Sequence, residues 1–264
     1  MTRTYLITAA SGIGAETART LVRNSGSSQP VQVFLAARNE AQCRALAEEL
    51  RALGGAAEYR AGDLTDPSFA PAVVRACMSA FRRLDALFNV AGISGRRFGD
   101  GPVHECTEEG WSLTLENNLT TQYRMCREGV RLMLKQPASD NGERGVILNM
   151  ASVLAIAPEP RHFDAISYAA SKGAIISMSR AMAACYAKQK IRVNVIAPGL
   201  VHTPMSARAS EDTGIVEFMK IKQPLVEGTI PLEAVAASCA YLLTDASHAV
   251  TGQVLAVDAG WSVS

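Results

Sequence analysis

Residues 4–14, TYLITAASGIG, are the stretch on which the prediction of the fold depends. The run 4–8 is typical of a short strand, and a helical pattern over 12–24 follows it directly. Glycines at such a turn let the backbone approach a pyrophosphate, and a helix N-terminus offers N–H groups and the positive end of its dipole. The turn therefore predicts an anion site formed by Ser11, Gly12, Ile13 and Gly14.

The rest of the chain alternates short β-branched runs with longer helical patterns. Strands are expected over 4–8, 31–36, 56–59, 86–88, 145–150, 192–196 and 254–256. Helices are expected over 12–24, 40–53, 67–82, 108–135, 166–188 and 232–243. Such alternation requires parallel strands joined by right-handed helical crossovers. It predicts an α/β fold with a Rossmann-type doubly wound parallel sheet, helices on both faces, and a single domain over 1–264.

The composition argues against a nucleic acid, a metal ion or a membrane as a partner of this chain. A chain of 264 residues with 48% hydrophobic content can bury a full core, and its net charge of +1 indicates no basic face for nucleic acid. The six cysteines form no CxxC pair or Cys/His cluster, so no metal is expected. The longest apolar stretch, 146–158, is too short and too polar to span a bilayer, and no signal-peptide pattern is present. We expect a soluble cytoplasmic protein acting on small molecules, with no nucleic-acid or membrane partner.

Two connections are longer than the others. Residues 24–30, NSGSSQP, are rich in turn formers and predict a surface loop before the second strand. Residues 202–229 show little regular pattern and follow the sixth strand, at the edge where open α/β sheets bind ligands. Apolar residues in this segment suit a lid over a modest apolar substrate, although they could equally pack a loop onto its own domain.

The end of the second predicted strand bears on the choice of cofactor. In dinucleotide folds an acidic residue near this point binds the ribose hydroxyls of NAD, whereas an arginine accommodates the 2′-phosphate of NADP. Here Ala37 stands where the acid would be, and Arg38 follows it. A charge-assisted contact of about 1.5–3 kcal/mol gives roughly ten- to hundredfold preference. The sequence favours NADP(H) over NAD(H), and a surface arginine at a helix start is the alternative.

A tyrosine and a lysine on one helix face predict proton chemistry. Tyr168 and Lys172 are four residues apart, so they share a face of the predicted helix. A free phenol has a pKa of about 10, and a neighbouring ammonium favours the phenolate and lowers that pKa. A helix-surface pair is the alternative for this spacing alone. Ser152, at the end of a predicted strand sixteen residues earlier, favours the catalytic interpretation.

Taken in order, these motifs resemble the short-chain dehydrogenase/reductase family, and the likeness covers nearly the whole chain. The residues that carry it are Thr8, Gly12 and Gly14 for TGxxxGxG, Asp63-Leu64, Asn89-Val90-Ala91-Gly92 for NNAG, Ser152, Tyr168 and Lys172 for the catalytic serine and YxxxK, Pro198-Gly199 and Thr203 for PGxxxT, and the segment 251–260. The phosphate loop is one residue short and lacks the family's first glycine. We therefore expect Ala9 to make the tight turn, at a steric cost if its φ is positive.

The resemblance implies a role for each motif residue. Ser152 would bind the substrate oxygen, Tyr168 would exchange its proton, and Lys172 would lower the tyrosine pKa while binding the nicotinamide ribose. Asn118, seven residues after Trp111, is the implied proton-relay residue, rather than Asn117. The implied cofactor contacts are Ser11, Gly12, Ile13, Gly14, Arg38, Asp63, Leu64, Asn89, Ala91, Gly92, Tyr168, Lys172, Pro198, Gly199, Val201 and Thr203.

Two further expectations come with the resemblance. The interval between Ser152 and Tyr168 is longer than usual for the family, and Arg161 and His162 in the extra segment could contact a substrate or lie in a solvated loop. The long helices of many relatives pair with symmetry mates, so a homodimer or homotetramer is expected.

The leading functional hypothesis is an NADP(H)-dependent carbonyl reductase or alcohol dehydrogenase. A 3-oxoacyl thioester reductase and a sugar or polyol dehydrogenase are alternatives within the same chemistry. A non-catalytic dinucleotide-binding sensor or scaffold is the alternative of another class, and the short phosphate loop is its one argument. The presence of Asn118, Ser152, Tyr168 and Lys172 together argues against it.

Overall fold

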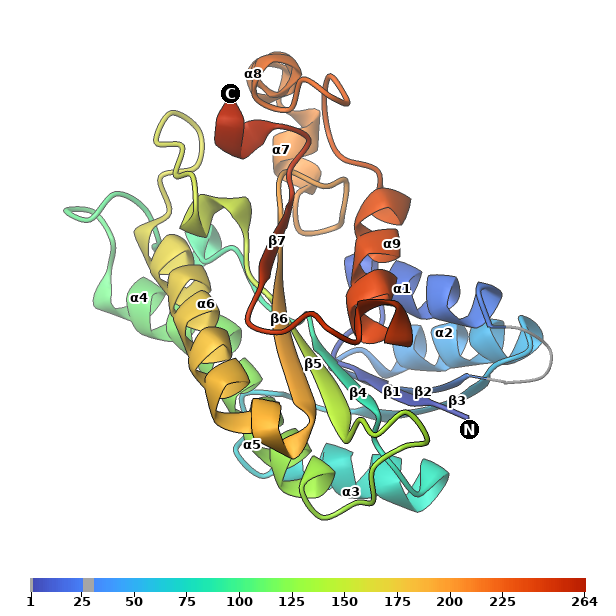
Figure 1. Cartoon of the computed structure of the whole chain (residues 1–264). Helices are drawn as coiled ribbons and strands as arrows, with labels where there is room; N and C mark the ends of the chain where they lie inside the picture. Colours follow the sequence, from blue (N-terminus) through green and yellow to red (C-terminus); the bar gives the residue numbers. More distant parts are fainter. Residues whose placement is uncertain (1, 26–30) are drawn as a thin grey trace.

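Seven parallel strands form one sheet in the computed structural model, which describes residues 2–25 and 31–264. The strand order is β3-β2-β1-β4-β5-β6-β7 (Figure 1). The strands are β1 (Thr4–Ile7), β2 (Gln32–Ala37), β3 (Ala56–Ala61), β4 (Ala86–Asn89), β5 (Gly145–Met150), β6 (Ile191–Pro198) and β7 (Val254–Val257). The predicted doubly wound parallel sheet is therefore confirmed, with each strand within a few residues of its expected range.

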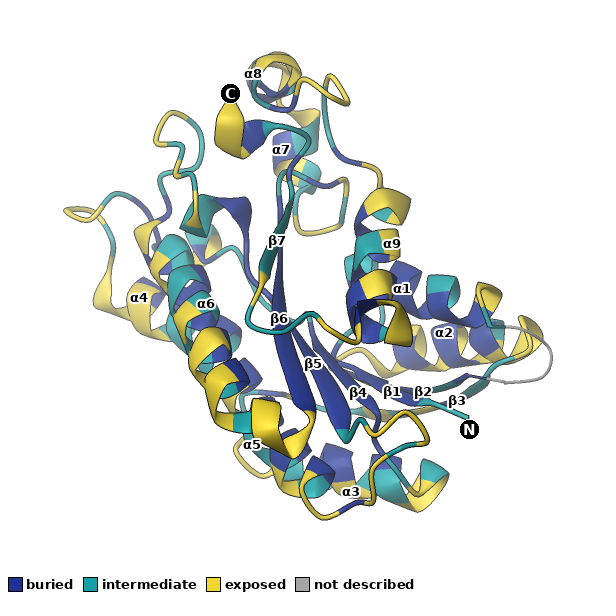
Figure 2. Ribbon diagram, viewed as in Figure 1, coloured by how far each residue is buried: buried dark blue, intermediate teal, exposed yellow. Residues whose placement is uncertain are grey.

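Helices cover both faces of the sheet, and each face has its own apolar core. On one face α1 (Gly12–Arg23), α2 (Glu40–Ala52) and α9 (Leu232–Leu243) pack against the strands. On the other, the cover consists of α3 (Phe69–Phe81), α5 (Thr121–Met133) and α6 (Ile166–Tyr186). The central strands are buried along their length, as expected for a parallel sheet covered on both sides (Figure 2).

The helix predicted over 108–135 is interrupted. The structure has α4 (Glu108–Leu115), then a π-helical turn at Glu116–Thr120, and then α5. A π-turn inserts one residue into the helical repeat without breaking the helix, so hydrophobic periodicity does not reveal it. The inserted turn contains Asn118, which is fully buried.

The interpretation of 202–229 as a loop with little regular structure was wrong. The segment contains α7 (Ala207–Glu211) and α8 (Thr213–Lys222), which lie beside the C-terminus at the top of Figure 1. Ile215 and Met219, four residues apart, bury one side of α8 against Trp261, and the Asp212 side chain caps its start. Two short helices stabilised mainly by such tertiary contacts carry little periodic signal of their own. Of the predicted loop 24–30, residues 26–30 lie outside the described residues.

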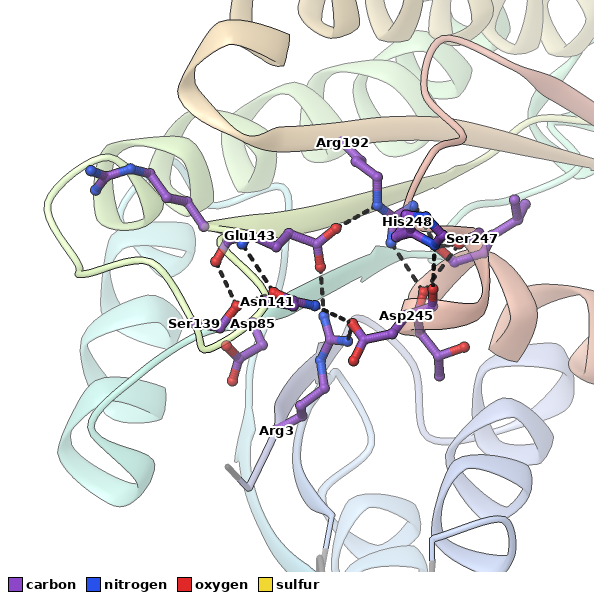
Figure 3. Close-up of polar contacts among 12 residues, drawn as sticks. Arg3, Asp85, Ser139, Asn141, Glu143, Arg192, Asp245, Ser247 and His248 are labelled. Atoms are coloured by element: carbon purple, nitrogen blue, oxygen red, sulfur yellow. Dashed lines mark hydrogen bonds and ion pairs between the residues drawn. The ribbon is translucent and has the colours of Figure 1, made fainter.

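Charged side chains tie the amino ends of the strands together, at the edge opposite α7 and α8. Arg192, at the start of β6, donates from Nε to Glu143 Oε1 (2.5 Å), and Arg3 donates from Nη2 to Glu143 Oε2 (2.7 Å). Arg3 also pairs with Asp245, which follows α9 (Figure 3). The largely buried carboxylate of Glu143 therefore joins segments next to β1, β5 and β6 at the amino ends of these strands. No helix in the described part of the chain is long and apolar enough to cross a membrane.

Candidate active site

A cavity of about 330 Å³ opens at the carboxyl ends of β1, β4, β5 and β6. Strand β1 pairs with β2 on one side and with β4 on the other, so the chain leaves this point in opposite directions and a crevice forms there. The predicted residues that line the cavity are Ser11, Gly12, Ile13, Ala91, Gly92, Ser152, Tyr168, Lys172, Pro198, Gly199, Val201 and Thr203. The predicted residues that do not line it are Gly14, Arg38, Asp63, Leu64, Asn89 and Asn118.

The start of α1 fits a pyrophosphate. Ser11 makes no side-chain cap, the first turn contains no acidic residue, and Gly12 has a φ of +54°. A helix start with these features presents backbone N–H groups and positive dipole to an anion without competition from a side chain. Gly14 is required by packing, because a Cβ there would lie 2.7 Å from Ala9 Cβ and 2.9 Å from Val90 Cγ1.

The short phosphate loop closes without the strain expected at Ala9. Ala9 is not among the non-glycine residues with positive φ in the described chain, so the expected steric cost was wrong. Thr8 stabilises the turn instead: its backbone N–H donates to Phe88 O (3.0 Å), and its hydroxyl accepts from Val90 N (2.9 Å). The hydroxyl joins the turn after β1 to the turn after β4.

Arg38 and Asp63 lie near each other outside the cavity wall. Both are exposed, and they follow the ends of the paired strands β2 and β3, where Ala37 is in register with Ala61. Asp63 Oδ1 accepts from Thr65 N (2.9 Å) and Thr65 Oγ1 (2.8 Å), and these bonds, with a smaller effect of Arg38, lower the pKa of Asp63. Leu64 is buried. The pair sits at the same carboxyl edge as the cavity, on the β2 side.

Asn89 forms a hydrogen bond between neighbouring strands and does not line the cavity. It is fully buried, and its Nδ2 donates to Asn149 Oδ1 (2.9 Å) on the neighbouring strand β5. Asn149 in turn donates to Ser179 Oγ (2.9 Å) on α6. These buried hydrogen bonds join β4, β5 and α6, while Ala91 and Gly92, which follow β4, line the cavity.

Ser152, Tyr168 and Lys172 all line the cavity. Tyr168 and Lys172 lie one turn apart on α6, with Lys172 Nζ 5.5 Å from the Tyr168 ring centroid. Burial raises the pKa of Tyr168, and a hydrogen bond with Ser152 opposes that shift. Burial lowers the pKa of Lys172 to about 7, while its Nζ donates to Met150 O (3.0 Å). The expected lowering of the tyrosine pKa by Lys172 stays a prediction that requires a protonated lysine.

Asn118 is held by backbone and helix contacts. Its Oδ1 accepts from Ile93 N (2.7 Å), and its Nδ2 donates to Ile93 O (3.1 Å) and Ser171 Oγ (3.1 Å). The side chain therefore joins the segment after β4 to α6. Gly92 allows this close approach, because a Cβ there would lie 2.7 Å from Asn118 Oδ1 and 3.6 Å from Lys172 Nζ. Its role as a proton relay stays a prediction.

Several cavity residues were not identified from the sequence. Trp261 is buried, donates from Nε1 to Ala157 O (3.0 Å) and packs against Phe163 with ring centroids 5.4 Å apart. Arg161 and His162 instead lie against Phe218, at 5.8 and 5.0 Å, and do not line the cavity. The other missed cavity residues include Arg96, Leu154, Leu200 and Arg208, whereas Met205 belongs to the apolar residues expected to cover a substrate. A tryptophan shortly after the last predicted strand was the one signal that could have been used.

A Rossmann-type sheet whose switch-point cavity brings together a serine, a tyrosine and a lysine defines an oxidoreductase that uses a nicotinamide dinucleotide. Comparisons with known proteins agree with this class. A family model described as Enoyl-(Acyl carrier protein) reductase matches residues 8–262. The chain belongs to the short-chain dehydrogenase/reductase family, whose members act on alcohol and carbonyl groups.

Named relatives span almost the full length of the chain. A ketoacyl reductase of the monensin polyketide synthase from Streptomyces virginiae is 34% identical, over 98% of this chain and 96% of that protein. The 2,5-dichloro-2,5-cyclohexadiene-1,4-diol dehydrogenase of Sphingobium indicum is 31% identical, over 98% and 97%. An actinorhodin polyketide ketoreductase variant crystallised with NADPH is 29% identical with a TM-score of 0.85, covering 100% of this chain and 98% of that one.

Burial of Lys172 predicts a pH-dependent stability difference for Lys172→Met. The folded-state pKa of about 7 is below the ordinary lysine value of 10.5, so the unfolded state binds more protons between these values. Wild-type stability therefore rises with pH across that window, and the cost of burying the amine is greatest below pH 7. We expect the variant without cofactor to be more stable at pH 6 by on the order of 4 kcal/mol, with the difference closing towards pH 10.

Denaturant unfolding at pH 6, 8 and 10 measures this difference. Met150 O keeps a donor in the variant, because it also accepts from Gln122 Nε2 (3.1 Å). Lys188→Met, at an exposed lysine after the same helix, is the matched control and should show no such trend. A Lys172→Met difference that is the same at all three pH values contradicts the prediction.

Proposed function

We propose that this protein is an NADP(H)-dependent carbonyl reductase or alcohol dehydrogenase in which Tyr168 is the general acid/base. The observation that carries the proposal is the convergence of Ser152, Tyr168 and Lys172 on one cavity beside an uncapped, glycine-rich helix start. The nicotinamide, when bound, supplies or accepts the hydride. We also propose that all the described elements act as one domain that binds both cofactor and substrate.

The chain's own residues would handle the substrate oxygen. The Ser152 hydroxyl donates a hydrogen bond to the carbonyl oxygen and orients it towards Tyr168. Tyr168 then gives its proton to that oxygen during reduction, or takes one from the alcohol during oxidation. Lys172 would bind the ribose hydroxyls, and in its protonated form it would favour the tyrosinate. Ser11, Gly12, Ile13 and Thr203 would bind the phosphates and the amide of the cofactor.

The cavity wall bears on the class of substrate. Phe163 and Trp261 form an aromatic side, and Leu154 and Met205 add apolar surface. Such a wall suits a carbonyl on an apolar or cyclic framework better than a sugar, whose hydroxyl groups would need polar partners. A 3-oxoacyl thioester reductase remains the second candidate, because a relative that is 34% identical is named as a ketoacyl reductase. A panel of cyclic ketones and 3-oxoacyl thioesters, assayed by NADPH oxidation, separates the two and also tests the non-catalytic alternative.

Tyr168→Phe tests the assignment of the acid/base. The variant keeps the ring but loses the exchangeable proton and the bond with Ser152, so turnover should fall by about 10²–10⁴-fold. Cofactor affinity should remain within about twofold of wild type, since the backbone of α6 is unchanged. Steady-state rates and nucleotide fluorescence titration measure the two effects. A variant with wild-type turnover contradicts the proposed mechanism.

Arg38→Ala tests the proposed preference for NADP(H). Removing the guanidinium should weaken NADPH binding by roughly ten- to hundredfold and leave NADH binding unchanged, because only NADPH carries the 2′-phosphate. The wild-type preference should shrink as salt rises, because Arg38 is exposed. Arg75→Ala, at an exposed arginine on α3, is the matched control. Equal wild-type affinities for NADPH and NADH, measured by fluorescence titration, would rule out the preference.

We propose that the protein assembles as a homodimer or homotetramer through the outer face of α5 and α6. Trp111 on α4 and Tyr123 on α5 are 39% and 48% exposed, and Ala170 on α6 is also exposed. A Cβ at Gly173 would meet nothing within 4 Å, so α6 has room for a close neighbour. Light scattering at micromolar concentration should give twice or four times the mass of one chain, and a monomer there contradicts the proposal.

A further inference from the structure

The helix that carries Tyr168 and Lys172 has no cap of its own. The residue at its N-cap position is Ala165, which offers no side-chain acceptor, and its first turn contains no acidic residue. The first N–H groups of a helix have no partner within the helix and need acceptors from elsewhere when they are buried. Ser167, in this first turn, is fully buried.

Asp100 supplies those acceptors from a distant part of the chain. Its Oδ1 accepts from Ser167 N (2.9 Å) and its Oδ2 from Tyr168 N (2.9 Å). The neighbouring Gly101 O accepts from Ile166 N (3.2 Å). Asp100 is only 6% exposed, so its charge interacts with the positive end of α6 with little screening. The backbone of Tyr168 itself is thus hydrogen-bonded to a carboxylate 68 residues earlier.

The loop around Asp100 is shaped to deliver this carboxylate. Gly95 and Gly99 have φ of +78° and +92°, a conformation that other residues adopt only with strain. A Cβ at Gly95 would lie 2.8 Å from Asp100 Oδ2, so the glycine also leaves room for the side chain. The same loop begins with Ile93 and Ser94, which line the cavity, and Ile93 is fastened to Asn118. One segment therefore forms cavity wall and holds the start of α6.

We infer that Asp100 is a positioning residue, which fixes the backbone of Tyr168 relative to the cavity wall formed by residues 91–94. The two hydrogen bonds fix the position of the first turn of α6 along its axis and its rotation about that axis. They thereby fix the position of the tyrosine hydroxyl relative to Ser152. A displacement of about 1 Å at a reacting group can lower a rate by roughly a hundredfold. This role rests on the proposed chemistry of Tyr168.

Asp100→Asn is the direct test. The substitution keeps the shape and one acceptor, but turns an NH₂ group towards an N–H of α6 and removes the charge. We expect kcat to fall by about 10- to 100-fold, with the KM for a ketone and the affinity for NADPH within about twofold of wild type. Weakening the contact with Ser152 removes an effect that lowers the tyrosine pKa. The pH at which alcohol oxidation rises should therefore move upwards.

Thr107→Val is the matched control. Thr107 caps the neighbouring helix α4 by accepting from Gly110 N (2.9 Å), and its hydroxyl also donates to Phe98 O (3.4 Å). The control therefore removes a cap and one long hydrogen bond to the same loop, but no hydrogen bond to α6. It should lower stability without changing kcat or the pH profile. Asp100→Glu, which keeps the charge and both acceptors but adds a methylene, covers the case in which Asp100→Asn fails to fold, and the folded variant should show the same kcat loss.

The outcomes separate this inference from the proposed function. Wild-type kcat in the folded Asp100 variant, or the same kcat and pH profile in the Asp100 variant and Thr107→Val, overturns the positioning role. If Tyr168→Phe is inactive while Asp100→Asn is fully active, the positioning role alone fails. If Tyr168→Phe itself is fully active, the proposed function fails first.

Discussion

The pairing of β1 with β2 on one edge and β4 on the other is the constraint on which the site depends. Because the chain departs in opposite directions from the carboxyl ends of β1 and β4, nothing in the sheet can fill the space between the two following turns. Thr8 fixes the width of that crevice, since its backbone and hydroxyl join Phe88 and Val90 across it. Two buried hydrogen bonds, from Asn89 to Asn149 and from Asn149 to Ser179, then join β4, β5 and α6.

Burial sets the electrostatics of the reaction centre. It raises the pKa of Tyr168 and lowers that of Lys172 to about 7, so both groups favour their neutral forms in the protein without cofactor. The hydrogen bond from Ser152 opposes this at the tyrosine. A positive charge beside Tyr168 favours the phenolate. Lys172 can therefore lower the pKa of Tyr168 only when Lys172 itself is protonated. The folded chain thus holds two groups whose proton affinity responds to what binds beside them.

Sequence reasoning succeeded where local chemistry and order along the chain are sufficient. Alternating periodicity gave the seven strands, and the spacing of Tyr168 and Lys172 placed both on the cavity side of α6. It failed where a contact between distant segments decides the conformation. The π-turn at Asn118, the helices α7 and α8, and the position of Trp261 all depend on such contacts. The sequence also placed Asn89 at the end of a strand, but it did not indicate that the side chain donates a hydrogen bond to Asn149 on the neighbouring strand.

The sequence by itself determined the parallel sheet, the glycine-rich start of α1 and three of the side chains that face the cavity, Ser152, Tyr168 and Lys172, because periodicity and residue chemistry act over a few neighbouring residues. Only the tertiary structure decided how those groups are held. Ala9 turns without positive φ because Thr8 is anchored to the next turn, and α6 begins at Ile166 because Asp100, far away in the chain, accepts from its first N–H groups. These hydrogen bonds join residues 67 to 82 positions apart, and no local pattern encodes them.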